Sequence, residues 1–335
     1  MQKVSRSFAI LIPYLEEPLN FFLSTSYLIC RVVDNIEDCH QPSTWKKSRF
    51  IEFIHLMKRQ DSVDDILSAW HQHDWPGLTP DEKKLMGKQG GQLWKIYHRI
   101  PFDTRQIICY WIEQMATGMN QMEARLLSIK SFSQSEVKVL ANEDDYNQYC
   151  YFVAGTVSHL STALVINHYN LGKDIAHNLY AHCEACGLGL QKTNIIKDFQ
   201  NDLLRGISYL PDSWMSESNY TPINLQGAEP KWISKVLEDI LKALHDAGSY
   251  LLGLPYAASG YRMASLLCLL PAYQTILLAS RQMGSLFTSG HQLKIPRITM
   301  EECLTEATKM LNDNNAIRNY CDLVEQKILA GFAQI

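Results

Sequence analysis

The stretch Arg31-Val-Val-Asp34-Asn-Ile-Glu37-Asp38 places three carboxylates in an otherwise apolar helical pattern. On a helix, Asp34 and Asp38 lie on one face, one turn apart. Two negative charges at this spacing repel each other, and the repulsion grows when the surroundings are apolar. The stretch therefore favours a bound cation, and its hard oxygen donors indicate Mg²⁺ rather than a soft metal.

A second acidic stretch, Asn194-Ile-Ile-Lys197-Asp198-Phe-Gln-Asn-Asp202, repeats this arrangement far along the chain. Asn194, Asp198 and Asp202 follow one another at four-residue spacing and so share one helix face. A lone acidic pair on a helix is usually a solvated surface feature. Two such stretches, both embedded in apolar sequence, instead predict a metal site in the interior of a helical bundle.

The composition is that of a soluble globular protein with a large core. The chain has 335 residues, of which 46% are hydrophobic and 20% charged, and its formal net charge is −4. That negative charge argues against nucleic acid as a partner. No repeat and no linker rich in glycine, serine or proline divides the sequence, so we expect a single domain over residues 1–335.

Apolar residues recur at helical spacing along nearly the whole chain. The expected helices span residues 8–38, 45–58, 80–98, 103–129, 146–168, 173–204, 229–252, 257–288 and 300–333. Alternating β-branched runs bounded by turns do not occur as a set, so a sheet is not expected. The predicted fold class is therefore all-α, a helical bundle.

Nine cysteines in apolar helical stretches predict buried thiols in a reducing compartment. Cys183-Glu-Ala-Cys186 is interpreted as helix core rather than as a redox or zinc site. The uncharged run between Arg262 and Arg281 is long enough to span a membrane. Pro271 interrupts it, which favours a buried core helix that ends or kinks at the proline.

Basic residues near the acidic stretches narrow the choice of ligand. Arg31 lies three residues before Asp34 on the same helix face, and Ser5-Arg6-Ser7 stands at the start of the first expected helix. Arg6 and Arg31 are candidate donors to phosphate oxygens, with helix-terminal amides as further donors. Taken alone, each arginine is as readily explained as a surface residue.

Four motifs stand in order along the chain: Ser5-Arg6-Ser7-Phe8, Tyr27 with Arg31 to Asp38, Tyr149-Cys-Tyr-Phe-Val-Ala-Gly155, and Gln191-Lys-Thr-Asn-Ile-Ile-Lys-Asp198-Phe-Gln-Asn-Asp202. In order and separation they resemble the motifs of squalene synthases, in the squalene/phytoene synthase family. The likeness continues through Leu267-Cys-Leu-Leu-Pro271 and Leu293-Lys-Ile295, so it covers most of the chain. The residues around Gln191 are closer to the squalene synthase branch than to the phytoene synthases.

The resemblance implies an all-α isoprenoid synthase fold, a single bundle around a central apolar cavity, in which two aspartate-rich helices hold diphosphates through Mg²⁺. It implies head-to-head condensation of two farnesyl diphosphates to presqualene diphosphate, followed by reduction to squalene with NADPH. The residues that match the family's metal ligands are Asp34, Glu37, Asp38, Asn194, Asp198 and Asp202. Those expected to act in catalysis are Asp34, Asp38, Asp198, Asp202 and Tyr151.

The same resemblance implies further binding residues. Positions expected to bind substrate are Ser5, Arg6, Ser7, Tyr27, Arg31, Phe152 and Gln191. Positions expected to bind diphosphate or nucleotide phosphate are Arg6, Arg31, Lys197 and Lys294. No complete GxGxxG motif follows a strand, so NADPH is not expected in a Rossmann domain.

No signal peptide and no hydrophobic tail are visible in the sequence. We therefore expect a cytoplasmic protein without a transmembrane anchor. Its greasy product implies peripheral contact with a membrane surface during release. No feature of the sequence indicates an oligomeric state.

Three departures from the family pattern concern the reduction step. Phe152 stands where typical members have a tyrosine, and a phenyl ring cannot move a proton. Tyr151 is adjacent, but one residue along a helix rotates a side chain by about 100°. Ile207 takes the place of a family arginine, with Arg205 close by, and the basic cluster at Lys294 is thinned.

Three functions therefore stay open. The first is a squalene synthase that performs both steps. The second is a head-to-head prenyltransferase without the reduction, which releases presqualene diphosphate or a dehydrosqualene. The third is a non-catalytic protein that binds prenyl diphosphates, although such a protein would be expected to lose metal ligands that this chain retains.

Overall fold

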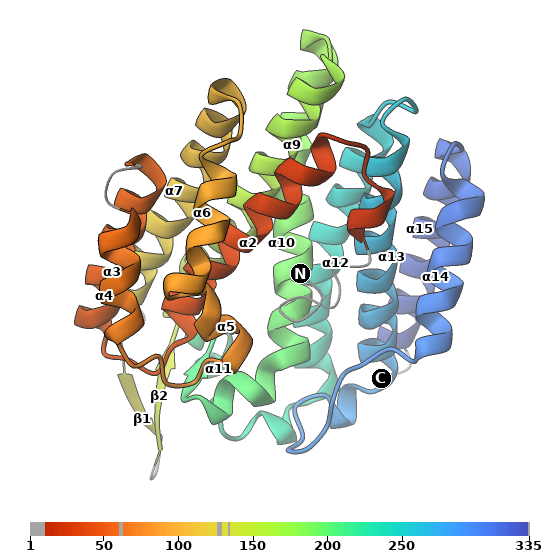
Figure 1. Ribbon diagram of the computed structural model, residues 1–335. Coiled ribbons are helices and arrows are strands. Elements are labelled where there is room, and N and C mark those ends of the chain that lie inside the picture. The colour runs from red at the N-terminus through yellow and green to blue at the C-terminus, as the bar shows by residue number, and fades with distance from the viewer. Residues whose placement is uncertain (1–10, 60–62, 126–128, 133–134, 334–335) are drawn as a thin grey trace. The chain divides into compact units, whose positions relative to one another are not determined.

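The computed structural model describes residues 11–59, 63–125, 129–132 and 135–333, and most of these residues are helical (Figure 1). The chain divides into two compact units. Unit 1 comprises Met1–Ala124 and His159–Gly172, and unit 2 comprises Arg125–Ser158 and Lys173–Ile335. The prediction that residues 1–335 form one domain stays a prediction.

Unit 1 is built from short and medium helices. They are η1 (Ile12–Tyr14), α2 (Leu19–Asp38), α3 (Ser43–Lys58), α4 (Val63–Gln72), α5 (Pro80–Leu85), η3 (Lys88–Gly90), α6 (Gly91–Tyr97), nearly all of α7 (Phe102–Arg125) and most of α9 (Thr156–Tyr169). α2 packs against α3, α5 and α6. Its apolar side chains, among them Ile29, Val33 and Ile36, are completely buried. Burial of each such side chain stabilises the fold by roughly 1.5–3 kcal/mol, which holds α2 in place.

The helix expected over residues 80–98 is divided into α5, η3 and α6. A capping box begins α5, because the Glu82 amide donates to Thr79 Oγ1 at 3.4 Å and the Thr79 amide donates to Glu82 Oε2 at 2.9 Å. Glycines at 87, 90 and 91 follow, and glycine weakens a helix interior. The sequence analysis also missed α4, whose apolar pattern is only ten residues long.

Unit 2 is built around longer helices. Its elements are β1 (Ile129–Phe132), β2 (Ser135–Val139), α8 (Glu143–Cys150), η4 (Tyr151–Gly155), the start of α9, α10 (Lys173–Leu204), β3 (Ile207–Ser208), α11 (Asp212–Ser216), η5 (Leu225–Gly227), α12 (Pro230–Gly253), α13 (Ser259–Arg281), η6 (Met283–Ser285), α14 (Arg297–Met310) and α15 (Asn314–Phe332). α10 packs along α12, and α13 lies against α12, α14 and α15 (Figure 1).

A small three-stranded sheet contradicts the expectation of no sheet. β1 pairs antiparallel with β2, and β2 pairs parallel with β3, with Lys138 opposite Ile207. The helix expected to reach residue 129 ends at Arg125, and strand β1 begins at Ile129. These strands have only two to five residues. Such short segments give almost no period-two signal, which explains why the sequence analysis missed them.

The expectation that a helix ends at Pro271 is wrong, because α13 runs without interruption from Ser259 to Arg281 with the proline inside it; a kink at the proline stays a prediction. Two helical segments, Glu143–Tyr169 and Ser259–Arg281, are long and apolar enough to cross a membrane by length and composition. Buried core helices of soluble proteins pass the same test, and 72% of the apolar window of α13 is buried. The predicted character of α13 as a core helix is thus confirmed.

The cysteines and the C-terminal helices give one confirmation and one correction. All nine cysteines are free thiols, six of them buried, and Cys183 and Cys186 lie within α10 as expected. The helix expected over residues 300–333 is two helices, α14 and α15. Asp313 separates them, because its side chain caps α15 by accepting from the amides of Asn315 and Ala316 at 2.9 and 3.0 Å.

Arg262 of α13 is fully buried and joins three helix ends of unit 2. Its guanidinium donates to the carbonyls of Leu251 and Leu254 at 3.1 and 2.6 Å, at the end of α12. It also donates to the carbonyl of Leu311 at 3.0 Å and to Asn314 Oδ1 at 2.8 Å, between α14 and α15. Carbonyls at helix ends lack partners within the helix, and this one side chain donates to three of them; the Leu251 carbonyl also accepts from the Leu254 amide at 3.2 Å.

Replacement of Arg262 by methionine should lower the free energy of unfolding by about 2–4 kcal/mol, because four acceptors, two of them buried and two half-buried, lose the guanidinium donor. Urea unfolding followed by circular dichroism measures the change. Arg281→Met is the matched control at the exposed end of the same helix and should change stability by less than about 0.5 kcal/mol. Equal effects of the two substitutions would contradict the bridging role.

Candidate functional site

The first acidic motif occupies the last turns of α2 in unit 1. Arg31 Nη1 lies 3.5 Å from Asp34 Oδ2, and each side chain is 24% exposed. Arg31 Nη2 also donates to the Tyr27 hydroxyl at 3.4 Å. The buried Arg31 Nε has no hydrogen-bond partner within the part of the chain that the structure describes. A buried donor in this state suits an anionic ligand such as a phosphate.

Negative charge in this motif is not balanced. Burial raises the pKa of the Asp34 carboxyl from 3.8 to about 6; Arg31 opposes this rise, while Asp38 and Glu82 add to it. Burial, followed by the charges of Asp38 and Asp34, also raises the pKa of the Glu37 carboxyl well above its ordinary value. Burial and neighbouring acids thus disfavour the charged form of these carboxyls, which a bound cation would stabilise.

The second acidic motif lies on α10 in unit 2 and differs in its surroundings. Lys197 Nζ donates to Asn194 Oδ1 at 2.6 Å and lies 3.5 Å from Asp198 Oδ2. Arg205 Nη1 lies 3.4 Å from Asp202 Oδ1. The Asp198 side chain is 46% exposed, so its interaction with Lys197 is largely screened by water. These acids therefore have basic partners from their own helix or from the residue after it.

The oxygen donors of the two motifs suit a Mg²⁺ ion that is bound partly by the protein and partly by water and substrate phosphates. Carboxylate and amide oxygens are the hard donors that Mg²⁺ prefers. Within residues 11–59, 63–125, 129–132 and 135–333, no three His, Cys, Asp or Glu side chains gather closely enough to hold an ion by themselves. Mg²⁺ commonly binds through one or two carboxylates, waters and substrate phosphates instead. Both motifs are brought onto single helix faces, and a joint site formed by the two stays a prediction.

Other predicted residues fall outside these motifs. Ser5, Arg6 and Ser7 lie outside the described residues. Gln191 is half-buried on α10, and Lys294 is exposed in the segment before α14. The described residues therefore do not test the predicted NADPH contacts, and these contacts stay predictions.

The residues around Phe152 form a π-helical turn, η4, between α8 and α9. Such a turn holds one more residue than an α-helical turn. Its carbonyls are satisfied, because the Thr156 amide donates to Tyr151 and the Thr156 hydroxyl donates to Phe152 at 2.7 Å. A Cβ on Gly155 would lie 2.8 Å from the Tyr151 ring, so this ring packs directly on the glycine.

α10 touches this turn through Gly187. A Cβ at Gly187 would lie 2.4 Å from the Ala154 oxygen and 2.7 Å from the Gly155 nitrogen, both backbone atoms. The two backbones therefore meet without an intervening side chain. The π-helical turn and the direct contact were both missed by sequence reasoning. The only signal was the glycine in Gly187-Leu-Gly189, which the sequence analysis considered only as an incomplete nucleotide motif.

A buried pair of charges beside the first motif was also missed. Lys46 of α3 donates to the main-chain oxygen of Glu37 at 2.5 Å, and its Nζ lies 3.7 Å from Glu123 Oε2 on α7. Ser43 donates to Glu123 Oε1 at 2.6 Å. Lys46 and Glu123 are far apart in the sequence, so no spacing rule could have brought them together.

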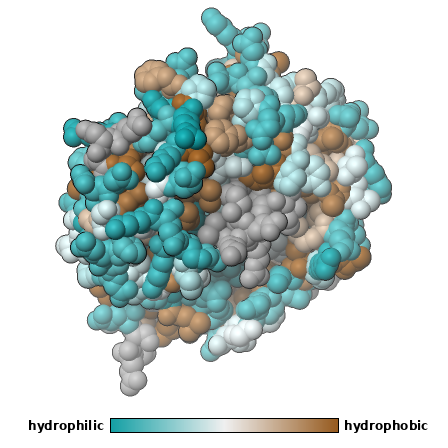
Figure 2. Space-filling model, viewed as in Figure 1, coloured by the Kyte–Doolittle hydropathy of each residue, from teal (hydrophilic) through white to brown (hydrophobic). Residues whose placement is uncertain are grey.

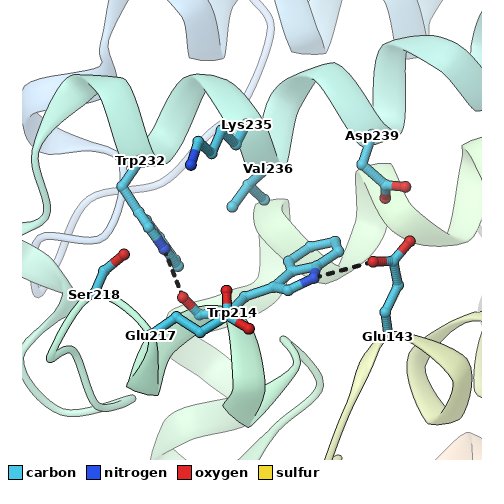
Figure 3. A pocket seen from close by; sticks show the side chains of 8 residues that line it. All are labelled: Glu143, Trp214, Glu217, Ser218, Trp232, Lys235, Val236 and Asp239. Atoms are coloured by element: carbon cyan, nitrogen blue, oxygen red, sulfur yellow. Dashed lines mark hydrogen bonds between the residues drawn. The ribbon is translucent and has the colours of Figure 1, made fainter.

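Unit 2 also has a pocket of about 300 Å³ (Figure 3). Its lining residues are Glu143, Trp214, Glu217, Ser218, Trp232, Lys235, Val236 and Asp239. Trp232 Nε1 donates to the Trp214 carbonyl at 2.8 Å, which fixes one wall. Asp239 accepts from the buried Lys192 at 2.9 Å. None of the lining residues was predicted for the site.

Comparison with known proteins gives a family match over most of the chain. The model of the family described as squalene/phytoene synthase matches residues 1–298. Squalene synthase ERG9 of Candida albicans is 33% identical over 224 residues, which cover 66% of this chain and 45% of that protein. Squalene synthase ERG9 of Saccharomyces cerevisiae is 29% identical over 223 residues, covering 65% and 45%. The matched segments thus span about half the length of these curated relatives.

Solved structures share the fold at low sequence identity. The complex of TcSQS with the ligand BPH1237 superimposes with a TM-score of 0.76 at 20% identity, covering 99% of this chain and 96% of that one. A dehydrosqualene synthase in complex with a ligand gives a TM-score of 0.61 at 16% identity, covering 92% and 93%. The likeness confirms the predicted all-α fold.

Gly187→Ala should destabilise the protein by about 2 kcal/mol or more, because the new methyl group would overlap backbone atoms of η4. Gly248→Ala is the matched control, since Gly248 lies within α12 and its Cβ would meet nothing within 4 Å. That substitution should stabilise the protein by about 0.5–1 kcal/mol through helix propensity. Thermal unfolding compares the two, and a neutral Gly187→Ala would rule out the direct backbone contact.

Asp34→Asn should stabilise the metal-free protein at pH 8 by about 1–2 kcal/mol. The folded-state pKa of about 6 lies above the ordinary 3.8, so wild-type stability falls as the pH rises through 6 and the carboxyl loses its proton. The advantage of the variant should vanish near pH 4. Urea unfolding with a chelator at several pH values measures it.

Asp246→Asn, on the exposed face of α12, is the control for that measurement and should shift stability by less than about 0.5 kcal/mol. An Asp34→Asn variant that is less stable than wild type at pH 8 would show that Arg31 already compensates the Asp34 charge.

Proposed function

This chain belongs to the squalene/phytoene synthase family, and we propose that it is a Mg²⁺-dependent prenyltransferase that converts farnesyl diphosphate to squalene. Two farnesyl diphosphates would condense head to head to presqualene diphosphate, and reduction with NADPH would follow. Curated relatives described as squalene synthases support this assignment. The observation that carries it is the pair of carboxyls Asp34 and Glu37, whose pKa values burial raises, beside the buried Arg31 Nε that has no partner among the described residues.

The proposal assigns roles to the two acidic motifs. Asp34, Glu37 and Asp38 on α2, and Asn194, Asp198 and Asp202 on α10, would hold Mg²⁺ together with the substrate diphosphates. When bound, Mg²⁺ neutralises the diphosphate as the allylic C–O bond breaks. Arg31 and Lys197 would donate to diphosphate oxygens, and Lys197 would exchange its present partners Asn194 and Asp198 for the substrate.

Tyr151 is the proposed source of the hydroxyl that Phe152 lacks. Its ring packs on Gly155 inside the π-helical turn, so its position is fixed by the backbone rather than by flexible neighbours. A phenol can accept or donate a proton while it remains in place, and it can orient a leaving group by hydrogen bonding. The ring centroids of Phe152 and Tyr151 lie 5.4 Å apart in an edge-to-face arrangement, and Phe152 would contribute an apolar wall.

A second candidate is the condensation without reduction, with presqualene diphosphate or a dehydrosqualene as product. Two observations favour it. Phe152 cannot supply a hydroxyl, and Ile207 of β3 replaces a basic side chain with an apolar one. Lys138 of β2 is the cross-strand partner of Ile207, so a positive charge does lie on the neighbouring strand. We therefore retain NADPH as a proposed cofactor and leave the reduction to experiment.

For its location we propose the cytoplasm, with peripheral membrane contact when the apolar product leaves. Exposed apolar side chains such as Phe102, Leu204 and Ile298 are distributed over several elements. The face in Figure 2 is mainly hydrophilic, with hydrophobic residues scattered across it. This distribution supports a transient contact more than a fixed docking surface.

Incubation of the purified protein with farnesyl diphosphate and Mg²⁺, with and without NADPH, tests the proposal. Mass spectrometry after phosphatase treatment should find squalene only in the presence of NADPH. Presqualene alcohol or a dehydrosqualene in both samples would favour the second candidate instead.

Asp198→Asn should abolish diphosphate release while the helical circular dichroism is unchanged, because a metal ligand is lost. Absence of any turnover by the wild-type protein would favour a non-catalytic protein that binds prenyl diphosphates.

A further inference from the structure

Lys46 and Glu123 form a buried ion pair directly behind the first acidic motif in unit 1. The two residues are only 5% and 6% exposed, although both have ionisable side chains. Lys46 Nζ lies 3.7 Å from Glu123 Oε2 and donates to the main-chain oxygen of Glu37 at 2.5 Å. Ser43 fixes the other carboxylate oxygen of Glu123 at 2.6 Å. α3 and α7 thus both reach the last turn of α2.

Such a pair needs an explanation, because burial of two charges costs several kcal/mol per ion and apolar replacements are often more stable. The contact between Lys46 and the Glu37 carbonyl suggests one. That carbonyl belongs to the last turn of α2, where helix carbonyls lack partners and the helix dipole is negative. Three carboxylates stand in the same turns, which makes this end of α2 an unfavourable place for a well-ordered helix.

We infer that Lys46, held by Glu123 and Ser43, is a positioning residue for metal binding by the first acidic motif. By fixing the carbonyl of Glu37, it fixes the main chain from which the Glu37 and Asp38 side chains project. The inference rests on the proposed function, since it takes these carboxylates as ligands of the metal. Groups behind a ligand commonly set metal affinity by 10–100-fold when they orient it.

Charge and position make opposite predictions for a substitution at Lys46. Loss of a nearby positive charge alone would tighten the binding of a divalent cation. Loss of the anchored main chain would weaken it, because the ligands would have to be ordered when the ion binds. The direction of the change therefore separates a positioning role from a purely electrostatic one.

The experiment measures Mn²⁺ binding by the full chain in the presence of inorganic diphosphate, with free Mn²⁺ followed by electron paramagnetic resonance. Lys46→Met should weaken the affinity for Mn²⁺ by about 10-fold or more. Lys46→Arg, which keeps the charge and the donors, should recover part of the loss. Asp34→Asn should also lose this Mn²⁺ ion, which would assign the ion to the first acidic motif.

Lys58→Met is the matched control on the same helix. Lys58 pairs with Glu113 at 2.5 Å near the opposite end of α3, and its side chain is 49% exposed. Its removal should leave Mn²⁺ binding unchanged. Thermal unfolding of every variant shows whether the fold is intact. If Lys46→Met does not fold, Ser43→Ala replaces it, because this variant removes the hydrogen bond that fixes Glu123 and changes no charge.

The outcomes test the inference separately from the proposed function on which it rests. Weaker Mn²⁺ binding by a folded Lys46→Met or Ser43→Ala protein supports the positioning role. Unchanged or tighter binding by the variant, with normal binding by wild type, overturns the inference and leaves the proposed function intact. A wild-type protein that binds no Mn²⁺ with diphosphate overturns both.

Discussion

Concentration of negative charge at the carboxyl end of a packed helix is the constraint on which unit 1 depends. Three carboxylates lie in the last turns of α2, where the helix dipole is also negative, and these negative charges repel one another. The structure responds with Arg31 from within the helix and Lys46 from a neighbouring one. Neither removes the excess, since burial and neighbouring acids still hold the pKa of Asp34 near 6. This charge arrangement supports the proposal that α2 binds a cation.

The two acidic motifs solve the same problem in different ways. On α10, Lys197 and Arg205 lie within or just beyond the helix and pair with its own acidic side chains. On α2, Arg31 pairs with Asp34 in the same manner, but a buried lysine from another helix, Lys46, also lies beside the motif. At the proposed metal site, the ion would compete with Lys197 for the exposed Asp198 on α10 and would neutralise the less exposed Asp34 on α2. We therefore expect the two helices to contribute unequally to metal affinity.

Spacing along the chain predicted what lies within one helix, and little of what lies between helices. The shared faces of Asp34 with Asp38, and of Asn194 with Asp198, follow from helical periodicity, as does the all-α fold. Lys46 and Arg262 could not be recognised, because each acts on carbonyls that come close only after folding. The sequence does not show which main-chain carbonyls need a partner, since every residue has one.

The π-helical turn has a consequence for how related sequences are compared. A turn with one extra residue changes the facing of everything before it relative to everything after it by about 100°. An alignment column that pairs identical letters before the turn can therefore pair side chains that face different neighbours. Tyr151 and Phe152 show the difficulty, because only one of them has a hydroxyl and the turn begins between Cys150 and Tyr151. For a relative that lacks the extra residue, equivalence across this segment is better judged by three-dimensional superposition than by column position.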